Sequence, residues 1–136
     1  MAHWEEMTLD GKPVRIFAGM PAGDGPFPAF VLCQHAPGLE AFTERVIDRL
    51  AENGFAAMAW DAYHRTGADH PDRRDHVTDA GLVADIKATL AHMGKNAKID
   101  MRRVAIAGHC MGGRTAYLGA ASIDAFRCCG VFWGGN

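Results

Sequence analysis

The fold of this chain is decided by the run Arg103-Val104-Ala105-Ile106-Ala107-Gly108-His109-Cys110-Met111-Gly112-Gly113. Its first half is apolar on consecutive residues, which is typical of a strand covered on both faces. The glycines that follow allow a tight turn into residues 114–121, which are small and compatible with a helix. Strand, G-x-C-x-G and helix together match the nucleophile elbow G-x-S-x-G, with Cys110 in the serine position. The run therefore predicts a parallel strand that presents a nucleophilic cysteine at its carboxyl end.

Further apolar segments on both sides of this run extend the pattern. The expected buried strands are residues 29–33, 55–60 and 128–133. Apolar residues also recur at helical spacing, and the expected helices are residues 40–53 and 77–94. Strands that alternate with helices predict a doubly wound, mostly parallel α/β sheet, preceded here by a hairpin around Asp10-Gly11. Ligands of such sheets bind at the carboxyl ends of the strands.

Size and composition indicate one globular domain over residues 1–136. The chain is 49% hydrophobic and 22% charged, as in an ordinary globular domain, and its 136 residues suffice for a core without disulfide or metal cross-links. It has 14 basic and 16 acidic residues, and because the basic ones are scattered we expect no nucleic-acid partner. No apolar run approaches the roughly 18 residues of a membrane span, and the N-terminus lacks the pattern of a signal peptide. We therefore expect a cytoplasmic protein with no membrane partner, whose cysteines are reduced.

Gly108 and Gly112 are expected to be required for steric reasons. The nucleophile of an elbow lies in a strained turn, where side chains two residues to either side collide with the neighbouring strand and helix. The helix N-terminus after Cys110 favours the thiolate, which is the reactive form of cysteine. The backbone N–H of Met111 is expected to donate to the oxyanion of a tetrahedral intermediate, with the N–H of Ala36 as the second donor. The alternative is a plain buried cysteine in a glycine-rich turn, such as a phosphate loop, although G-x-G-x-x-G is missing.

Tyr63 and Arg65 follow the carboxyl end of an expected strand, where they are candidates for substrate contact. The alternative is that they belong to an exposed loop, because residues 61–75 contain almost no apolar side chain and are typical of a surface loop. The same residues include several aspartates and histidines. Their spacing matches no zinc pattern, so no metal site is expected.

Four segments carry a family resemblance, and they are Gln34-His35 through Ala41-Phe42, Gly54-Phe55-Ala56-Ala57, Asp61-Ala62-Tyr63-His64-Arg65 and Gly108-His109-Cys110-Met111-Gly112-Gly113. Together they resemble the dienelactone hydrolases, cysteine-dependent members of the α/β-hydrolase fold. Cysteine in the elbow is the specific part, because most α/β-hydrolases use serine. The resemblance implies a three-layer sandwich and the hydrolysis of lactones or activated esters through a thiol acyl-enzyme, with a histidine as base and an aspartate that orients it. It implies a small-molecule ester or lactone substrate and no cofactor.

The resemblance is incomplete after Cys110. That part of the sequence contains no histidine, and its only carboxylate, Asp124, precedes the last expected strand and so lies at the wrong edge of the sheet. The triad of the family cannot close within these residues. We therefore expect a single truncated α/β-hydrolase-like domain that lacks the C-terminal strands, either as a shortened gene product or as a half-domain.

His35 stands where the resemblance implies a glutamate that contacts the resting thiol. The first and third parallel strands are neighbours in this fold, so the imidazole of His35 is expected to approach Cys110 as the base of a Cys–His dyad. The alternative is that His35 bonds a loop backbone or lines the oxyanion turn.

Three functions remain open. The first is hydrolysis of lactones or carboxylic esters through a Cys110 acyl-enzyme. The second is a catalytically silent homologue that acts as an oligomeric binding or assembly module, and the third is a thiol-redox protein that uses Cys110. The strand at residues 128–133 is expected to form an open edge that presents Phe132 and Trp133, which predicts a homodimer through this strand.

Overall fold

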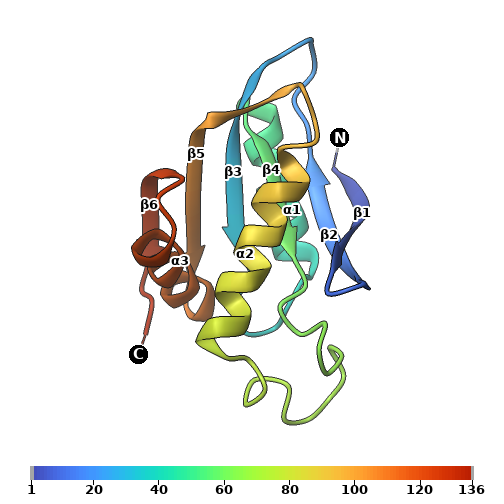
Figure 1. Ribbon diagram of the computed structural model, residues 1–136, viewed down its shortest axis with the longest axis vertical. Coiled ribbons are helices and arrows are strands. Elements are labelled where there is room, and N and C mark those ends of the chain that lie inside the picture. Colours follow the sequence, from blue (N-terminus) through green and yellow to red (C-terminus); the bar gives the residue numbers. More distant parts are fainter. Residues whose placement is uncertain (1, 136) are drawn as a thin grey trace.

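The middle layer of the protein is a six-stranded sheet, seen in the computed structural model, which describes residues 2–135 (Figure 1). The strands are β1 His3–Leu9, β2 Lys12–Gly19, β3 Phe27–Cys33, β4 Ala56–Trp60, β5 Ile99–His109 and β6 Phe126–Phe132. The helices are α1 Ala41–Glu52, α2 Asp79–Met93 and α3 Met111–Ser122. Across the sheet the strands follow the order β1-β2-β4-β3-β5-β6.

Parallel pairing dominates the sheet. β3 pairs in parallel with β4 on one side and with β5 on the other, and β6 continues the parallel part beyond β5. β1 and β2 form an antiparallel hairpin, and both residues of its Asp10-Gly11 turn have positive φ, 52° and 74°, as a type I′ turn requires. β2 then joins β4 in antiparallel pairing. The predicted doubly wound, mostly parallel sheet and its opening hairpin are confirmed.

Helices cover the two faces of the sheet unequally (Figure 1). On one face, Ile47 of α1 packs in a cluster with Phe17 and Leu32. On the other face, Ile86 of α2 and Ala116 of α3 belong to the main core of the protein. In the described residues, one face therefore carries two helices and the other carries one, which gives the predicted three-layer sandwich.

β5 begins at Ile99 rather than at Arg103, where the apolar run starts. Its first two residues pair with the start of β3, and the register then shifts before Val104 pairs with Ala29. Asp100 and its arginine neighbours occupy this first part of β5, so no apolar pattern marks it. β5 is longer than its apolar run because its first residues are held by pairing with β3, not by an apolar pattern of their own.

Burial differs from the sequence pattern in two places. Residues 128–133 have the apolar pattern of a buried strand, yet β6 is mostly exposed because it lies last in the order of the described sheet, where it forms the expected open edge. The predicted surface loop at residues 61–75 begins with three buried residues, of which Asp61 and Tyr63 are two. Burial of Asp61 is possible because its carboxylate accepts hydrogen bonds from the backbone N–H of Tyr63 and from the guanidinium of Arg15.

None of the helices in the part of the chain described here has the length and apolar character needed to cross a membrane.

Candidate active site

Cys110 lies in a strained turn between the carboxyl end of β5 and the start of α3. Its φ of 54° and ψ of −124° are rare for a residue with a side chain. The turn is held on both sides, because the N–H of Cys110 donates to the carbonyl of Phe132 (3.0 Å) and its carbonyl accepts from the N–H of Gly113 (3.0 Å). Cys110 is also exposed. An exposed thiol on a strained turn before a helix N-terminus is the arrangement of a nucleophile elbow.

Gly108 and Gly112 lie where no side chain fits. A Cβ on Gly108 would lie 2.4 Å from the carbonyl oxygen of Gly112, and a Cβ on Gly112 would lie 2.3 Å from the carbonyl oxygen of Cys33. Both obstacles are backbone atoms, which cannot move aside without displacing a whole element. The first turn of α3 therefore rests directly on the end of β3, and this contact brings the elbow beside the turn that follows β3.

The turn after β3 runs from His35 to Gly38 and is closed by a hydrogen bond from the N–H of Gly38 to the carbonyl of His35 (3.0 Å). Within residues 2–135, the N–H of Ala36 donates to no acceptor. Met111 is the first residue of α3, so its N–H precedes the intrahelical hydrogen bonds. Both N–H groups are thus free for an oxyanion, and their role as an oxyanion hole stays a prediction.

His35 is bonded to a carboxylate. Its Nε2 lies 2.8 Å from Oε1 of Glu40, whose other oxygen caps α1 by accepting from the N–H of Phe42 (3.0 Å). The N–H of Phe42 and the contact with His35 both hold the pKa of Glu40 below its ordinary value. Among the residues that the structure describes, no hydrogen bond joins His35 to Cys110. The Cys–His dyad stays a prediction.

His109 packs against His35 on the α1 side of the elbow. The centroids of the two imidazole rings are 4.7 Å apart, and Phe42 and Trp133 lie at the edges of the His109 ring. Burial lowers the pKa of His109, and the neighbouring His35 lowers it further, while Glu40 opposes both effects. The neutral imidazole is therefore the form that this packing favours.

Tyr63 is buried in the loop after β4 and contacts both residues of the predicted oxyanion hole. Its hydroxyl donates to the carbonyl of Ala36 (2.6 Å) and lies 3.6 Å from Sδ of Met111. The guanidinium of Arg73 lies over the Tyr63 ring, 5.2 Å from its centroid. A direct contact between Tyr63 and substrate stays a prediction, and the hydroxyl proton is already donated within the protein.

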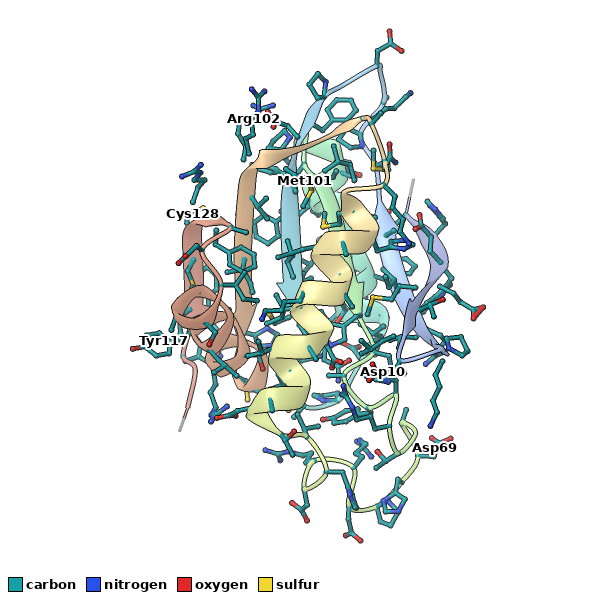
Figure 2. The ribbon with its side chains drawn as sticks, viewed as in Figure 1. Asp10, Asp69, Met101, Arg102, Tyr117 and Cys128 are labelled. Atoms are coloured by element: carbon teal, nitrogen blue, oxygen red, sulfur yellow. The ribbon has the colours of Figure 1, made fainter. Side chains whose placement is uncertain are left out.

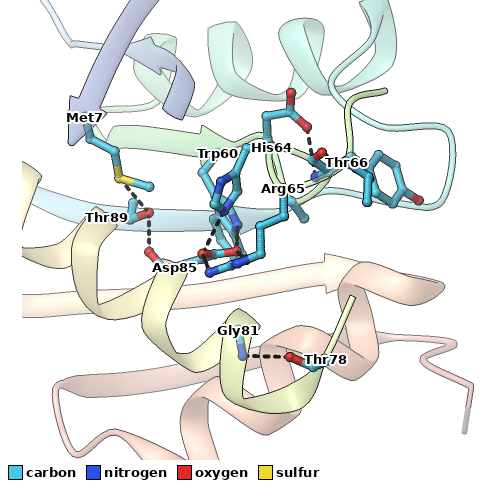
Figure 3. A network of polar contacts seen from close by, with 12 residues as sticks. Met7, Trp60, His64, Arg65, Thr66, Thr78, Gly81, Asp85 and Thr89 are labelled. Atoms are coloured by element: carbon cyan, nitrogen blue, oxygen red, sulfur yellow. Dashed lines mark hydrogen bonds and ion pairs between the residues drawn. The ribbon is translucent and has the colours of Figure 1, made fainter. Parts of the chain in front are cut away.

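Asp85 of α2 anchors the same loop (Figure 3). Its fully buried carboxylate accepts hydrogen bonds from both terminal nitrogens of Arg65 (3.2 and 2.8 Å) and from Nε1 of Trp60 (3.1 Å), and lies 3.0 Å from Nε2 of His64. These partners make the burial of the charge tolerable. The Arg65 guanidinium is directed to Asp85 in this structure. The predicted contact of Arg65 with substrate stays a prediction.

Two hollows flank the elbow. A polar hollow of about 420 Å³ reaches Met111, and Arg74 and Arg114 are part of its lining. An apolar groove of about 490 Å³ reaches Gly108 and His109 on the side of the sheet that α1 covers. Each has the size of a small-molecule site.

The other thiols do not belong to the elbow turn. Cys33 is buried in β3, and burial raises the pKa of its thiol. Cys128 and Cys129 lie on the outer strand β6 (Figure 2), and partial burial raises the pKa of Cys129. No three potential metal ligands converge among residues 2–135. Of the cysteines in this range, only Cys110 is both exposed and placed directly after the carboxyl end of a parallel strand.

The model of the dienelactone hydrolase family matches residues 14–136. The chain belongs to the dienelactone hydrolase family. The carboxymethylenebutenolidase of Pseudomonas sp. strain P51 is 32% identical, over 96% of this chain and 60% of the relative. That of Pseudomonas putida is 29% identical, over 92% of this chain and 58% of the relative. A crystal structure described as a dienelactone hydrolase of Klebsiella pneumoniae superposes with a TM-score of 0.91 at 26% identity, covering 98% of this chain and 60% of that one. This member of the dienelactone hydrolase family thus spans less than two thirds of the length of these relatives.

Three residues around the elbow, Asp85, Glu40 and Arg73, are not among the site residues predicted from the sequence. Asp85 had a usable signal, because it interrupts the buried stripe of α2 next to Ile86. Glu40 reaches His35 across an irregular turn, and Arg73 reaches Tyr63 within a long loop, so neither pair follows a periodic pattern.

Proposed function

We propose that this member of the dienelactone hydrolase family hydrolyses lactones or carboxylic esters through an acyl-enzyme on Cys110. The observation that carries the proposal is the backbone of Cys110, whose φ of 54° presents an exposed thiol at the N-terminus of α3. A purely structural cysteine gains nothing from such strain, whereas a nucleophile gains access to substrate. The relatives named carboxymethylenebutenolidase carry the name of a lactone substrate, which supports the same class of reaction.

In the proposed reaction the thiolate of Cys110 attacks the carbonyl carbon of the ester. The carbonyl electron pair moves to oxygen, and the N–H groups of Ala36 and Met111 stabilise the resulting oxyanion. When the oxyanion collapses, the bond to the alcohol oxygen breaks and that oxygen takes a proton from the base. A thioester remains on Cys110. Water then attacks the thioester, releasing the carboxylic acid and restoring the thiol.

His35 is the base in this proposal, and Glu40 orients it. With Nε2 directed to Glu40, the other ring nitrogen of His35 is left to take the thiol proton. A carboxylate bonded to an imidazole fixes the tautomer and stabilises the imidazolium that forms, as in the serine hydrolase triad. Hydrogen bonds of a catalytic base are often long before substrate binds, so the missing bond to Cys110 does not remove His35 from this role.

The test is a stopped-flow reaction of p-nitrophenyl acetate with the purified chain. A nitrophenolate burst close to stoichiometric, with an acetyl group found by mass spectrometry on the peptide that contains Cys110, is the expected result. Cys110→Ala is expected to abolish the burst, and Cys128→Ala, which removes an exposed thiol on β6, is the matched control. If the chain is not acylated but peroxide rapidly oxidises Cys110 to a sulfenic acid, the thiol-redox function replaces the proposed one.

The role of His35 is tested by the same burst. His35→Ala is expected to slow acylation, and Glu40→Gln to slow it less, because the imidazole is still present. An unchanged burst rate in His35→Ala would exclude His35 as the base.

A separate observation favours a second function, assembly into a homodimer through β6. In the described sheet β6 pairs only with β5, and beside its free edge Phe132 is 54% exposed and Trp133 79% exposed. An open edge with aromatic side chains is a template for another chain, and a two-fold axis is the common symmetry of such contacts. A catalytically silent assembly module would use the same surface.

Sedimentation equilibrium at micromolar concentration tests the assembly. The wild-type chain is expected to sediment as a dimer, and Val131→Lys, which puts a charge on exposed β6, is expected to give monomers. Tyr117→Lys, on the outer side of α3, is the control (Figure 2). A wild-type monomer would exclude the dimer.

A further inference from the structure

The hydroxyl of Tyr63 contacts both residues of the proposed oxyanion hole, through the backbone carbonyl of Ala36 and the side-chain sulfur of Met111. It donates to the carbonyl of Ala36 at 2.6 Å, and Sδ of Met111 lies 3.6 Å from the same oxygen. Ala36 follows β3 and Met111 begins α3, so these residues lie far apart in the sequence. A single hydroxyl thus links the turn after β3 to the Met111 side chain at the start of α3, and these two segments must keep a fixed distance for both N–H groups to reach one oxyanion.

The Tyr63 side chain is itself firmly held. It is 1% exposed, and its backbone N–H donates to Oδ1 of Asp61 at 3.0 Å. On one side of the ring lies the guanidinium of Arg73, which attracts the ring face. On another side lies Gly38, where an added Cβ would be 3.7 Å from Cε2 of Tyr63. The ring thus packs against the turn whose carbonyl the hydroxyl binds.

The hydrogen bond from Tyr63 acts on the peptide plane next to the one that carries the Ala36 N–H. The N–H of Ala36 and the carbonyl of His35 share one peptide plane, which the hydrogen bond from Gly38 already holds. The next plane carries the carbonyl of Ala36, and Tyr63 holds that one. With both planes fixed, the two backbone dihedrals of Ala36 are fixed as well. Loss of the Tyr63 hydroxyl frees the second plane, and with it the ψ dihedral of Ala36, which loosens the turn that positions the Ala36 N–H.

We propose that Tyr63 is the positioning residue of the oxyanion hole, holding the turn at Ala36 in register with Met111 through its hydroxyl. The inference rests on the proposed acyl-enzyme function. In this role Tyr63 does not touch the reacting atoms, because its hydroxyl donates to the carbonyl of Ala36 and its side chain is buried. The consequence is specific to reactions that generate an oxyanion.

Two reactions of the same thiol separate this role from a general structural one. Acylation of Cys110 by p-nitrophenyl acetate passes through a tetrahedral oxyanion, whereas alkylation by iodoacetamide displaces iodide at carbon and forms none. Removing a donor outright costs about a hundredfold or more in rate. Tyr63→Phe leaves both N–H donors present but loosens one, so the expected loss is about tenfold in acylation, with alkylation unchanged.

The experiment compares both rates in wild-type, Tyr63→Phe and Tyr117→Phe chains. Tyr117 is an exposed tyrosine on α3 (Figure 2), and its variant is expected to match wild type in both reactions. Arg73→Gln is the second variant, because it releases the Tyr63 ring without removing the hydroxyl, and a smaller loss in acylation alone is expected. It keeps the test open if Tyr63→Phe does not fold.

The outcomes distinguish the two proposals. If the wild-type chain is alkylated but never acylated, the proposed hydrolase function fails. If the wild-type chain is acylated and Tyr63→Phe is acylated at the same rate, the positioning role fails while the hydrolase function stands. Equal losses in acylation and alkylation would also overturn the positioning role, since they would show general damage to the elbow.

Discussion

Replacing Asp85 with alanine is expected to be strongly destabilising. The carboxylate is fully buried, and four hydrogen bonds from Arg65, Trp60 and His64 end on it. Breaking a buried ion pair from one side costs about 3–5 kcal/mol, because the remaining charge is left without its partner. The Arg65 side chain is 39% exposed, so water re-solvates part of its charge, and we expect a loss near the lower end, about 3 kcal/mol. That is a large share of the roughly 5–15 kcal/mol by which a domain is stable.

Urea unfolding followed by circular dichroism measures this loss, and α2 offers a matched control. Asp79 lies on the same helix, and its carboxylate also accepts two hydrogen bonds from one arginine, Arg114, at 2.8 and 3.1 Å. Its side chain is 58% exposed, and an exposed ion pair contributes little because water solvates both charges. Asp79→Ala is therefore expected to change the free energy of unfolding far less than Asp85→Ala. Equal losses in the two variants would refute the argument that burial gives the Asp85 contacts their value.

Three further predictions concern the elbow and its surroundings. Gly112→Ala is expected to push α3 away from β3 and to lower both the melting temperature and the rate of Cys110 alkylation. Gly135→Ala is the control, because a Cβ there meets no atom within 4 Å, and it is expected to change neither quantity. An unchanged melting temperature and alkylation rate in Gly112→Ala would contradict the clash. The pKa of His109 is lowered from its ordinary value of 6.5, so the unfolded chain takes up a proton first and stability falls as the pH drops below 6.5. His109→Gln is expected to flatten the curve of unfolding free energy against pH in that window, and an unchanged slope would count against it. The pKa of Glu40 is lowered from 4.5, so its contribution is present above pH 4.5 and lost below it, and Glu40→Gln is expected to remove that acid-dependent loss in urea unfolding at a series of pH values.

Much of the fold could be predicted because its signals are local. Each parallel strand except the start of β5 has an apolar run, and the turn at Asp10-Gly11 has the residues that positive φ requires. Burial was harder to predict, because it depends on the position of an element in the sheet. The run Cys128–Trp133 has the composition of a buried strand, but lies on the outer strand of the described sheet.

The candidate site also has one part that could be predicted from the sequence and one part that could not. Strand, glycines and helix around Cys110 are contiguous in the sequence, so the strained turn could be predicted from its motif. The contacts between Glu40 and His35 and between Asp85 and Arg65 join side chains across turns and elements, and no periodicity encodes them. Tyr63 shows the limit most clearly, because its position after β4 indicated substrate contact while its hydroxyl is bonded to the turn after β3.

The exposed ring of Trp133 gives the protein an optical consequence. It lines the apolar groove beside the elbow, and its ring centroid lies 6.3 Å from that of His109. Of the three tryptophans, Trp60 is fully buried and Trp4 lies on β1, at the far edge of the described sheet. Indole emission shifts to shorter wavelength when water leaves the ring, so a molecule that enters the groove is reported by the emission of Trp133. The chain carries a native fluorophore beside the elbow, and binding at this edge is measurable without a label.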